Sequence, residues 1–132
     1  MTLVRPPRPV SADDVAATRQ PVDRARLLPP RVFHDRQIFD FEQQAWFARS
    51  WLCVGREEDV AEPRSYLLAS IALESAIVVR DRGGRLHALS NVCRHRGSTI
   101  LDAPTGRIVR LQCPYHAWVY DLDGSLLRAP HT

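Results

Sequence analysis

The sequence predicts a mainly β fold, a small antiparallel β-sandwich or barrel preceded by a proline-rich arm and one amphipathic helix. Six of the ten prolines fall within residues 1–32. Apolar residues then recur at three- and four-residue spacing up to residue 52, as in an amphipathic helix. Beyond residue 51, short apolar and β-branched runs alternate with Gly/Asp turn signals, which is typical of antiparallel strands. A chain of 132 residues has the size of one ordinary domain.

Residues 1–32 are expected to form an extended arm, because they combine many prolines with little apolar periodicity. A short helical turn is expected after Ser11, where Asp13 and Asp14 suit a helix start. Residues 33–50 are expected to form a helical lead-in with Asp35 as the N-cap. Its apolar stripe comprises Ile38, Phe41, Ala45, Ala48 and Leu52. The aromatic residues Phe39, Phe41, Trp46 and Phe47 are predicted to pack into a core, and Trp46 and Trp51, which flank the stripe, are predicted to pack beneath the next element.

Residues 51–132 are expected to form the β domain. The predicted strands are Trp51–Gly55, Tyr66–Ala69, Ala76–Arg80, Leu86–Val92, Ile108–Gln112, Trp118–Asp121 and Ser125–Arg128. Turn signals at residues 81–84 and 121–124 separate two pairs of these strands. Cys53 lies between Leu52 and Val54 and is predicted to be a buried core thiol. His87 is expected on a strand face, exposed or hydrogen-bonded, while His34 and His131 are placed in loops without a role.

Charge and composition exclude several classes of function. The net charge of +3 resides entirely in residues 1–36, and the remainder has as many acids as arginines, so we expect no nucleic-acid partner. No run approaches the roughly 18 apolar residues of a membrane span, and no signal-peptide pattern is present. We therefore expect no membrane partner and a cytoplasmic location. Three cysteines, an odd number, indicate reduced thiols that are free to bind metal.

Two Cys/His pairs carry the chemistry of the sequence. Cys93 and His95 form a Cys-x-His pair, Cys113 and His116 form a Cys-x-x-His pair, and 17 residues separate the two pairs. Two loop tips that face each other would combine two thiolates and two imidazoles in one site. Such a set can hold one tetrahedral zinc ion, or a [2Fe–2S] cluster with both cysteines on one iron. Gly97 and Gly124 are expected to relieve crowding where the backbone approaches the sulfur atoms.

The spacing, together with the runs Asn91–Gly97 and Cys113–Trp118, is identified as the Rieske signature. Over about residues 28–132 the chain resembles the α subunits of Rieske non-haem iron ring-hydroxylating oxygenases. The resemblance implies a Rieske-type fold with two cluster-binding loops and one Rieske [2Fe–2S] cluster. It places Cys93 and Cys113 on one iron and His95 and His116 on the other, with the imidazole edges as the electron exit. Tyr115 and Trp118 would pack around the cluster. Because the loops lack a further cysteine pair, the potential is expected toward the low end of roughly −150 to +300 mV.

The resemblance also implies partners. A flavin reductase or ferredoxin would donate electrons, and a mononuclear iron in an oxygenase catalytic domain, in a neighbouring α subunit, would accept them. In the family, two histidines and a carboxylate hold that Fe(II), and the remaining His34, His87 and His131 offer no such set. We therefore expect the chain to lack the catalytic domain and to transfer electrons only, with aromatic acids and quaternary amines both open as substrates. A stand-alone Rieske ferredoxin, a zinc-binding structural module and a decayed gene product that no longer folds around metal are the alternatives.

Overall fold

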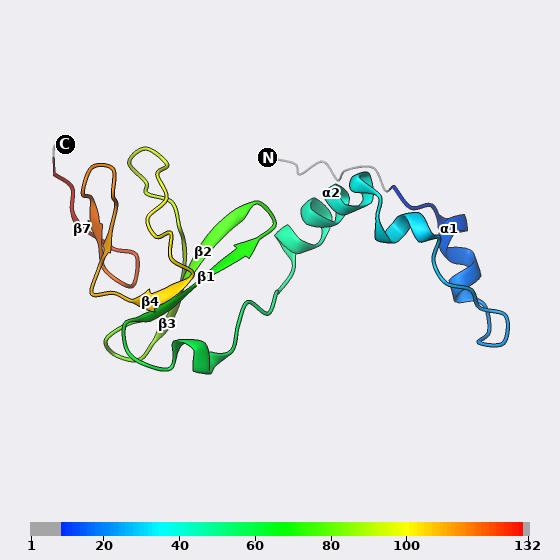
Figure 1. Cartoon of the computed structure of the whole chain (residues 1–132), viewed down its shortest axis with the longest axis horizontal. Helices are drawn as coiled ribbons and strands as arrows, with labels where there is room; N and C mark the ends of the chain where they lie inside the picture. The colour runs from blue at the N-terminus through cyan, green and yellow to red at the C-terminus, as the bar shows by residue number, and fades with distance from the viewer. Residues whose placement is uncertain (1–8, 131–132) are drawn as a thin grey trace. The chain divides into compact units, whose positions relative to one another are not determined.

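The computed structural model describes residues 9–130, which divide into two compact units, one up to Leu52 and one from Cys53 onward (Figure 1). Residues 1–8 of the predicted arm, together with His131 and Thr132, lie outside the described residues. None of the helices in the described part is long and apolar enough to cross a membrane.

The first unit begins with a short helix whose capping residues are contacted by an arginine from later in the unit. Helix α1 (Ala12–Ala16) starts at Ser11, whose hydroxyl accepts a hydrogen bond from the Asp14 amide at 3.1 Å. The Asp14 carboxylate accepts in return from the Ser11 amide at 2.7 Å, which completes a capping box. The Arg31 guanidinium, from the 3₁₀ turn Pro30–Phe33, pairs with Asp14 and donates to the Pro9 carbonyl. The helical turn after Ser11 is thus confirmed, while the segment around it folds back on itself instead of running extended.

Helix α2 (Arg36–Ala45) confirms Asp35 as its N-cap, since the Asp35 carboxylate accepts from the Gln37 amide at 2.7 Å. The helix is shorter than the apolar stripe, because it ends at Trp46 and a 3₁₀ turn, Phe47–Arg49, follows. Ile38 is the residue of α2 that is fully buried. The prediction that the aromatic residues pack into a core is wrong for Phe39 and Trp46, which are 51% and 56% exposed, and Phe47 and Trp51 are exposed as well. The apolar stripe does not form one buried face. Helix α2 ends at Ala45, so the helical spacing does not continue through Ala48 and Leu52.

The second unit confirms the mainly β, antiparallel fold class. In the described residues, one sheet has the order β3-β2-β1-β4 and a smaller sheet has the order β5-β6-β7. The strands are β1 (Ser65–Ile71), β2 (Glu74–Arg80), β3 (Leu86–Ser90), β4 (Thr105–Arg107), β5 (Leu111–Gln112), β6 (Val119–Tyr120) and β7 (Leu126–Arg128). A 3₁₀ turn, Glu57–Val60, precedes β1.

Two details of this unit differ from the sequence prediction. Residues 51–55 form no strand, and Cys53 is exposed, with its sulfur 3.6 Å from the Gly55 carbonyl, so the prediction of a buried core thiol is wrong. This apolar run has no neighbouring strand to pair with in the described residues, so its backbone forms no inter-strand hydrogen bonds. Strand β4 was not predicted, because it is short, fully exposed and contains Gly106. A Cβ at Gly106 would lie 2.9 Å from the Tyr66 ring, so glycine lets β4 approach β1.

The two predicted turns are present and share one geometry. The backbone amides of Asp81 and Asp121 each donate to the carbonyl of the residue four positions later, Arg85 and Ser125, at 2.8 Å. Gly84 and Gly124 adopt positive φ values of 87° and 88°, which favour glycine. The Asp81 carboxylate also lies 2.8 Å from Nε2 of His87, so the expectation that His87 is hydrogen-bonded is confirmed. That contact, with amide donors in the turn, lowers the pKa of Asp81.

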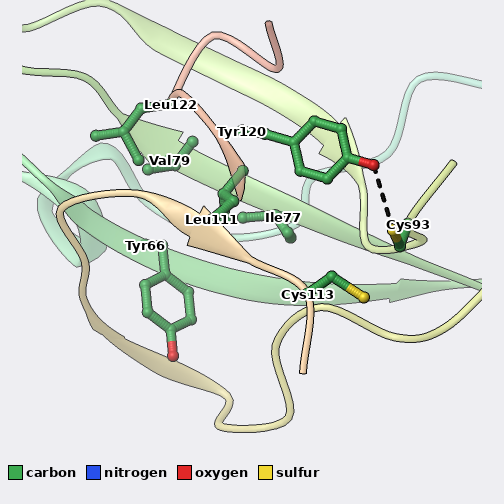
Figure 2. Close-up of a cluster of buried hydrophobic side chains, with 8 residues drawn as sticks. All are labelled: Tyr66, Ile77, Val79, Cys93, Leu111, Cys113, Tyr120 and Leu122. Atoms are coloured by element: carbon green, nitrogen blue, oxygen red, sulfur yellow. Dashed lines mark hydrogen bonds between the residues drawn. The ribbon is translucent and has the colours of Figure 1, made fainter. Parts of the chain in front are cut away.

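One core cluster of the second unit includes two cysteines of the predicted site. Its buried members are Tyr66, Ile77, Val79, Cys93, Leu111, Cys113, Tyr120 and Leu122. Figure 2 shows Cys93 and Cys113 at one end of this cluster. Ile77 and Val79 lie on one face of β2 and are fully inaccessible to solvent. The sheets therefore bury the sulfur atoms by the same packing that stabilises the fold.

Candidate metal centre

The two loops that carry the Cys/His pairs are built on one backbone plan. The Cys93 amide donates to the Ser98 carbonyl at 2.8 Å, and the Cys113 amide donates to the Trp118 carbonyl at the same distance. In return, each cysteine carbonyl accepts from the amide four residues later, of Gly97 at 3.0 Å and of Ala117 at 3.1 Å. Both loops extend toward the same end of the second unit (Figure 1). Each cysteine therefore lies at the base of a closed turn, with its histidine in the turn.

The fourth position after each cysteine has a left-handed backbone. Gly97 has φ 71° and Ala117 has φ 55°. A Cβ built on Gly97 would meet no atom within 4 Å, so the expectation that Gly97 relieves crowding near sulfur is wrong. The glycine serves the turn conformation instead. Gly124 does not relieve crowding near sulfur either. A Cβ at Gly124 would lie 2.9 Å from the Leu89 side chain, so this glycine makes room for Leu89.

The two thiols lie deep in the core and receive hydrogen bonds. Cys93 is 1% exposed and Cys113 is 2% exposed. The Cys93 sulfur lies 3.2 Å from the Tyr120 hydroxyl, as the dashed line in Figure 2 marks. Burial opposes ionisation of Cys113, but amide donors from Tyr115 and His116 and the side chains of Cys93 and Ser98 outweigh it and lower the pKa of this thiol. The surroundings of Cys113 therefore favour its thiolate, the form that binds metal.

The two imidazoles lie against each other. The ring centroids of His95 and His116 are 4.7 Å apart, with an angle of 64° between the planes. Trp118 stacks on His95 at 4.8 Å with nearly parallel planes, and Tyr115 lies 3.8 Å from the His116 ring. Tyr115 and Trp118 thus contact the two histidines, while their packing around a cluster stays a prediction. Both imidazoles are partly exposed.

These residues fit a metal group that takes nitrogen and sulfur ligands. Nδ1 of His95 is buried, and within residues 9–130 it has no hydrogen-bond partner. A buried ring nitrogen in this state costs free energy unless it receives a partner, and a metal ion supplies one. Thiolate and imidazole together suit zinc and iron–sulfur centres. In the same part of the chain, no three of the His, Cys, Asp and Glu side chains converge on a common point for a single ion.

Three residues that support the site were not identified from the sequence. Asn91 is 1% exposed and ties both ends of the first loop: its amide donates to the Leu101 carbonyl at 2.8 Å, and its carbonyl oxygen accepts from the Leu101 amide at 2.9 Å. Tyr120 contacts Cys93, and Ala117 takes the left-handed position of the second loop. The equal spacing of Gly97 and Ala117 from their cysteines was a signal that could have pointed to Ala117.

Comparison with known proteins assigns this fold and these loops to a family. Residues 50–132 match the family described as the Rieske [2Fe-2S] domain. The chain belongs to this family. The Rieske domain here is similar to the α subunit of N,N-dimethyl phenylurea N-demethylase of Sphingobium sp. (strain YBL2), with 36% identity over 79% of this chain and 23% of that protein. It is 41% identical to the oxygenase subunit of glycine betaine monooxygenase of Chromohalobacter salexigens, over 77% of this chain and 23% of that protein.

A solved structure agrees with the Rieske assignment. Naphthalene 1,2-dioxygenase from Rhodococcus sp. superposes with a TM-score of 0.74 at 33% identity, covering 79% of this chain and 24% of the dioxygenase chain. The chain thus spans about a quarter of the length of the relatives it matches. The cofactor of the family is the Rieske [2Fe–2S] cluster.

Proposed function

We propose that the chain is the electron-carrying Rieske domain of an oxygenase α subunit. In this proposal, Cys93 and Cys113 hold one iron of a single [2Fe–2S] cluster, and His95 and His116 hold the other. The observation that carries it is the pairing of the side chains, thiol with thiol in the core and imidazole with imidazole toward the surface. When bound, the cluster accepts and releases one electron at a time.

The surrounding residues prepare this site. The core around Ile77 and Leu111 excludes water from the thiols, which strengthens every hydrogen bond to sulfur. The Tyr120 hydroxyl accepts from the Arg94 amide at 3.2 Å, so its own proton is free to point at the Cys93 sulfur. Trp118 fixes the plane of His95 by stacking on it. The partly exposed imidazoles then offer the shortest route between the site and a partner.

The proposal extends to partners and domain organisation. Residues 1–32 would form the arm, residues 33–50 the helical lead-in and residues 51–132 the Rieske domain. A flavin reductase or ferredoxin would supply electrons, and a mononuclear non-haem iron in a separate catalytic domain, in a neighbouring α subunit, would receive them. The two relatives, named as an N-demethylase α subunit and as the oxygenase subunit of a monooxygenase, are more than three times as long as this chain and support that arrangement. Their names include a phenylurea demethylase and a glycine betaine monooxygenase, so the substrate class depends on residues beyond this domain.

Metal analysis of the whole chain tests the proposal. The chain is purified without air, and iron, sulfide and zinc are quantified on the sample used for absorbance and reduced EPR spectra. We expect two irons and two sulfides per chain, with the EPR signal of a mixed His/Cys cluster. Zinc in place of iron would support a structural zinc module and overturn the proposal, as would a folded chain without metal.

A ligand substitution tests the residue assignment. His116→Cys replaces a neutral ligand by an anionic one, so the reduction potential should fall if the cluster survives. His87→Gln is the matched control, because His87 is bonded to Asp81 at the opposite end of β3 from the first loop. An unchanged or higher potential in His116→Cys, with a clean cluster spectrum, would contradict the assignment.

A further inference from the structure

We propose that Asn91 is the positioning residue of the first loop (residues 93–98) and that it opposes an opening of this loop through which the metal group is lost. Asn91 lies two positions before Cys93 and acts through the backbone that carries Cys93 and His95. This inference rests on the function proposed above, because it assigns retention of the metal group to one of the two loops.

The second loop (residues 113–118) is closed by paired strands. Strands β5 and β6 flank it, and Gln112 pairs with Val119 next to the loop. Leu111 pairs with Tyr120 one position further out. Strand β7 supports β6 from its other side, since the order of this sheet is β5-β6-β7. Opening of the second loop would therefore have to break strand pairing within a sheet.

The first loop has less backbone support at the equivalent positions. Next to the loop, Val92 and Thr99 form one isolated bridge. One position further out, the Ile100 amide donates to the Asn91 carbonyl at 3.3 Å. The chain that follows, residues 101–104, forms no strand in the described structure. Backbone pairing alone therefore holds the first loop closed less firmly than the second.

The Asn91 side chain supplies hydrogen bonds where strand pairing ends. Its amide group donates to the Leu101 carbonyl at 2.8 Å and to the Ser75 hydroxyl at 3.1 Å. Its carbonyl oxygen accepts from the amides of Leu101 at 2.9 Å and Ile100 at 3.3 Å. These contacts use both donors and both lone pairs of the side chain. Asn91 is 1% exposed, so water does not compete for them.

These contacts join both ends of the first loop to the larger sheet. Ser75 belongs to β2, an inner strand of that sheet, and its carbonyl also accepts from the Asn91 amide at 2.9 Å. Asn91 thus fixes the start of the loop to β2 and the end of the loop, at Leu101, to itself. Cys93 and His95 lie between the two fixed points, so the clamp determines where both side chains stand.

The position of the clamp identifies the loop that opens. In the proposed cluster, Cys93 and His95 each bind a different iron, so an opening of the first loop would remove one ligand from each iron. An opening of the second loop would also pull Leu111 and Tyr120 out of the buried core. Local openings occur where the fewest contacts must break. Loss of metal should therefore proceed through the first loop.

Hydrogen exchange of the full chain tests the positioning role. Mass spectrometry follows peptides that cover residues 91–101 and 111–120, on the chain as purified and whichever metal it holds. Asn91→Ala should speed exchange of the first peptide at least about tenfold and leave the second within about twofold, because four hydrogen bonds at the first loop are lost. Ser75→Ala removes one of these bonds and should speed the first peptide about two- to fivefold.

Iron release from the loaded chain is the second measurement. Excess EDTA removes the iron at a temperature well below Tm, and the loss of visible absorbance gives the rate. Asn91→Ala should release iron at least about tenfold faster than the unchanged chain. Val60→Ala is the matched control, because Val60 is buried in a separate core cluster, with Leu67 and Ala69. Its truncation weakens the whole unit and should leave the release rate within about twofold.

Two outcomes would overturn the role of Asn91. One is equal acceleration of exchange in both peptides by Asn91→Ala. The other is equal acceleration of iron release in Asn91→Ala and Val60→Ala, because the metal would then leave through unfolding of the whole unit. Should Asn91→Ala fail to fold, Ser75→Ala decides: faster exchange confined to residues 91–101 supports the proposal, and unchanged exchange contradicts it.

The two proposals fail in distinguishable ways. Iron, sulfide and absorbance are recorded before each experiment, so a chain without the cluster contradicts the proposed function whatever its exchange pattern. A chain with an intact cluster whose first loop exchanges equally with and without the Asn91 side chain contradicts the positioning role alone.

Discussion

Tyr120 connects the small sheet to the first loop through a single hydroxyl group. Burial raises the pKa of this phenol, and the neighbouring Cys93 thiol raises it further, so the hydroxyl keeps its proton. A protonated hydroxyl that accepts from the Arg94 amide can donate to sulfur. Donation to sulfur stabilises negative charge, and a reduced centre carries more negative charge than an oxidised one.

Tyr120→Phe should therefore lower the reduction potential of the loaded chain. A difference of about 1 kcal/mol in hydrogen-bond free energy between the two redox states corresponds to about 40 mV for one electron. A redox titration followed by absorbance measures the change. Tyr66→Phe serves as the control, because Tyr66 belongs to the same core and contacts Gly106 of β4. A potential that stays constant in Tyr120→Phe with an intact spectrum would show that the hydroxyl does not donate to the sulfur.

Ala117 is strained by its position in the second loop. A left-handed conformation costs an L-residue about 1–2 kcal/mol, and glycine avoids this cost but loses about 0.5–1 kcal/mol through greater chain entropy. Ala117→Gly should therefore stabilise the chain by roughly 0.5–1 kcal/mol. Urea denaturation of the loaded chain measures the change in the free energy of unfolding.

Gly97→Ala is the reciprocal test of the same strain. Because a Cβ at Gly97 meets no neighbour within 4 Å, only the backbone conformation can oppose the substitution. We expect a loss of about 1 kcal/mol. If both substitutions left the free energy of unfolding unchanged, the two loops would not share the left-handed position.

At the scale of elements, the first helix depends on an ion pair within its own unit. The Arg31 guanidinium, followed by donors from Ser11, lowers the pKa of Asp14 from 3.8 to about 2. The pKa of Asp14 is lower in the folded chain than in the unfolded chain. Its stabilisation of the folded chain is therefore fully present above pH 3.8 and is lost as the pH falls through about 2. In Arg31→Gln, the midpoint of Asp14 should move up toward 3.8, as an NMR titration of its side chain can measure. A midpoint that stays low would assign the shift to the capping box alone.

The sequence predicted those elements that local chemistry determines. Asp35 and Ser11 are strong helix starts, and the Asp/Gly turns at residues 81–84 and 121–124 form regardless of what lies around them. Residues 51–55 and the aromatic residues of α2 were predicted wrongly, because a strand or a buried face requires a partner elsewhere in the chain. The family of the site could be recognised from the spacing of the four Cys and His residues. Asn91 and Tyr120 could not be identified, because their contacts join residues 10 and 27 positions apart.

At the scale of the whole molecule, metal content and stability should be linked. Cys93 and Cys113 belong to the same buried cluster as Ile77 and Val79. If they hold iron as proposed, its removal would leave two buried thiols without their metal and a buried His95 nitrogen that has no hydrogen-bond partner within residues 9–130. Iron removal should lower Tm by at least about 10 °C, because a loss of 2–3 kcal/mol shifts a small domain by that amount. Calorimetry before and after chelation measures it.

Cys53→Ser is the control for this link. Cys53 is exposed and lies outside the buried cluster, so its loss should change neither the cluster spectrum nor Tm. A spectrum that disappears in Cys53→Ser would give this thiol a part in the site. A Tm that is the same with and without iron would show that the sheets fold independently of the centre.

The closed turns of the two loops also bear on the speed of charge transfer. Each cysteine is fixed through both its amide and its carbonyl, and Asn91 locks the ends of the first loop. Loop backbones that are hydrogen-bonded in this way move little when the charge beside them changes. The reorganisation energy for gain or loss of an electron should therefore be small. We therefore expect nearly the same positions of the loop atoms in the oxidised and reduced chain, and a rate governed by the approach of the partner.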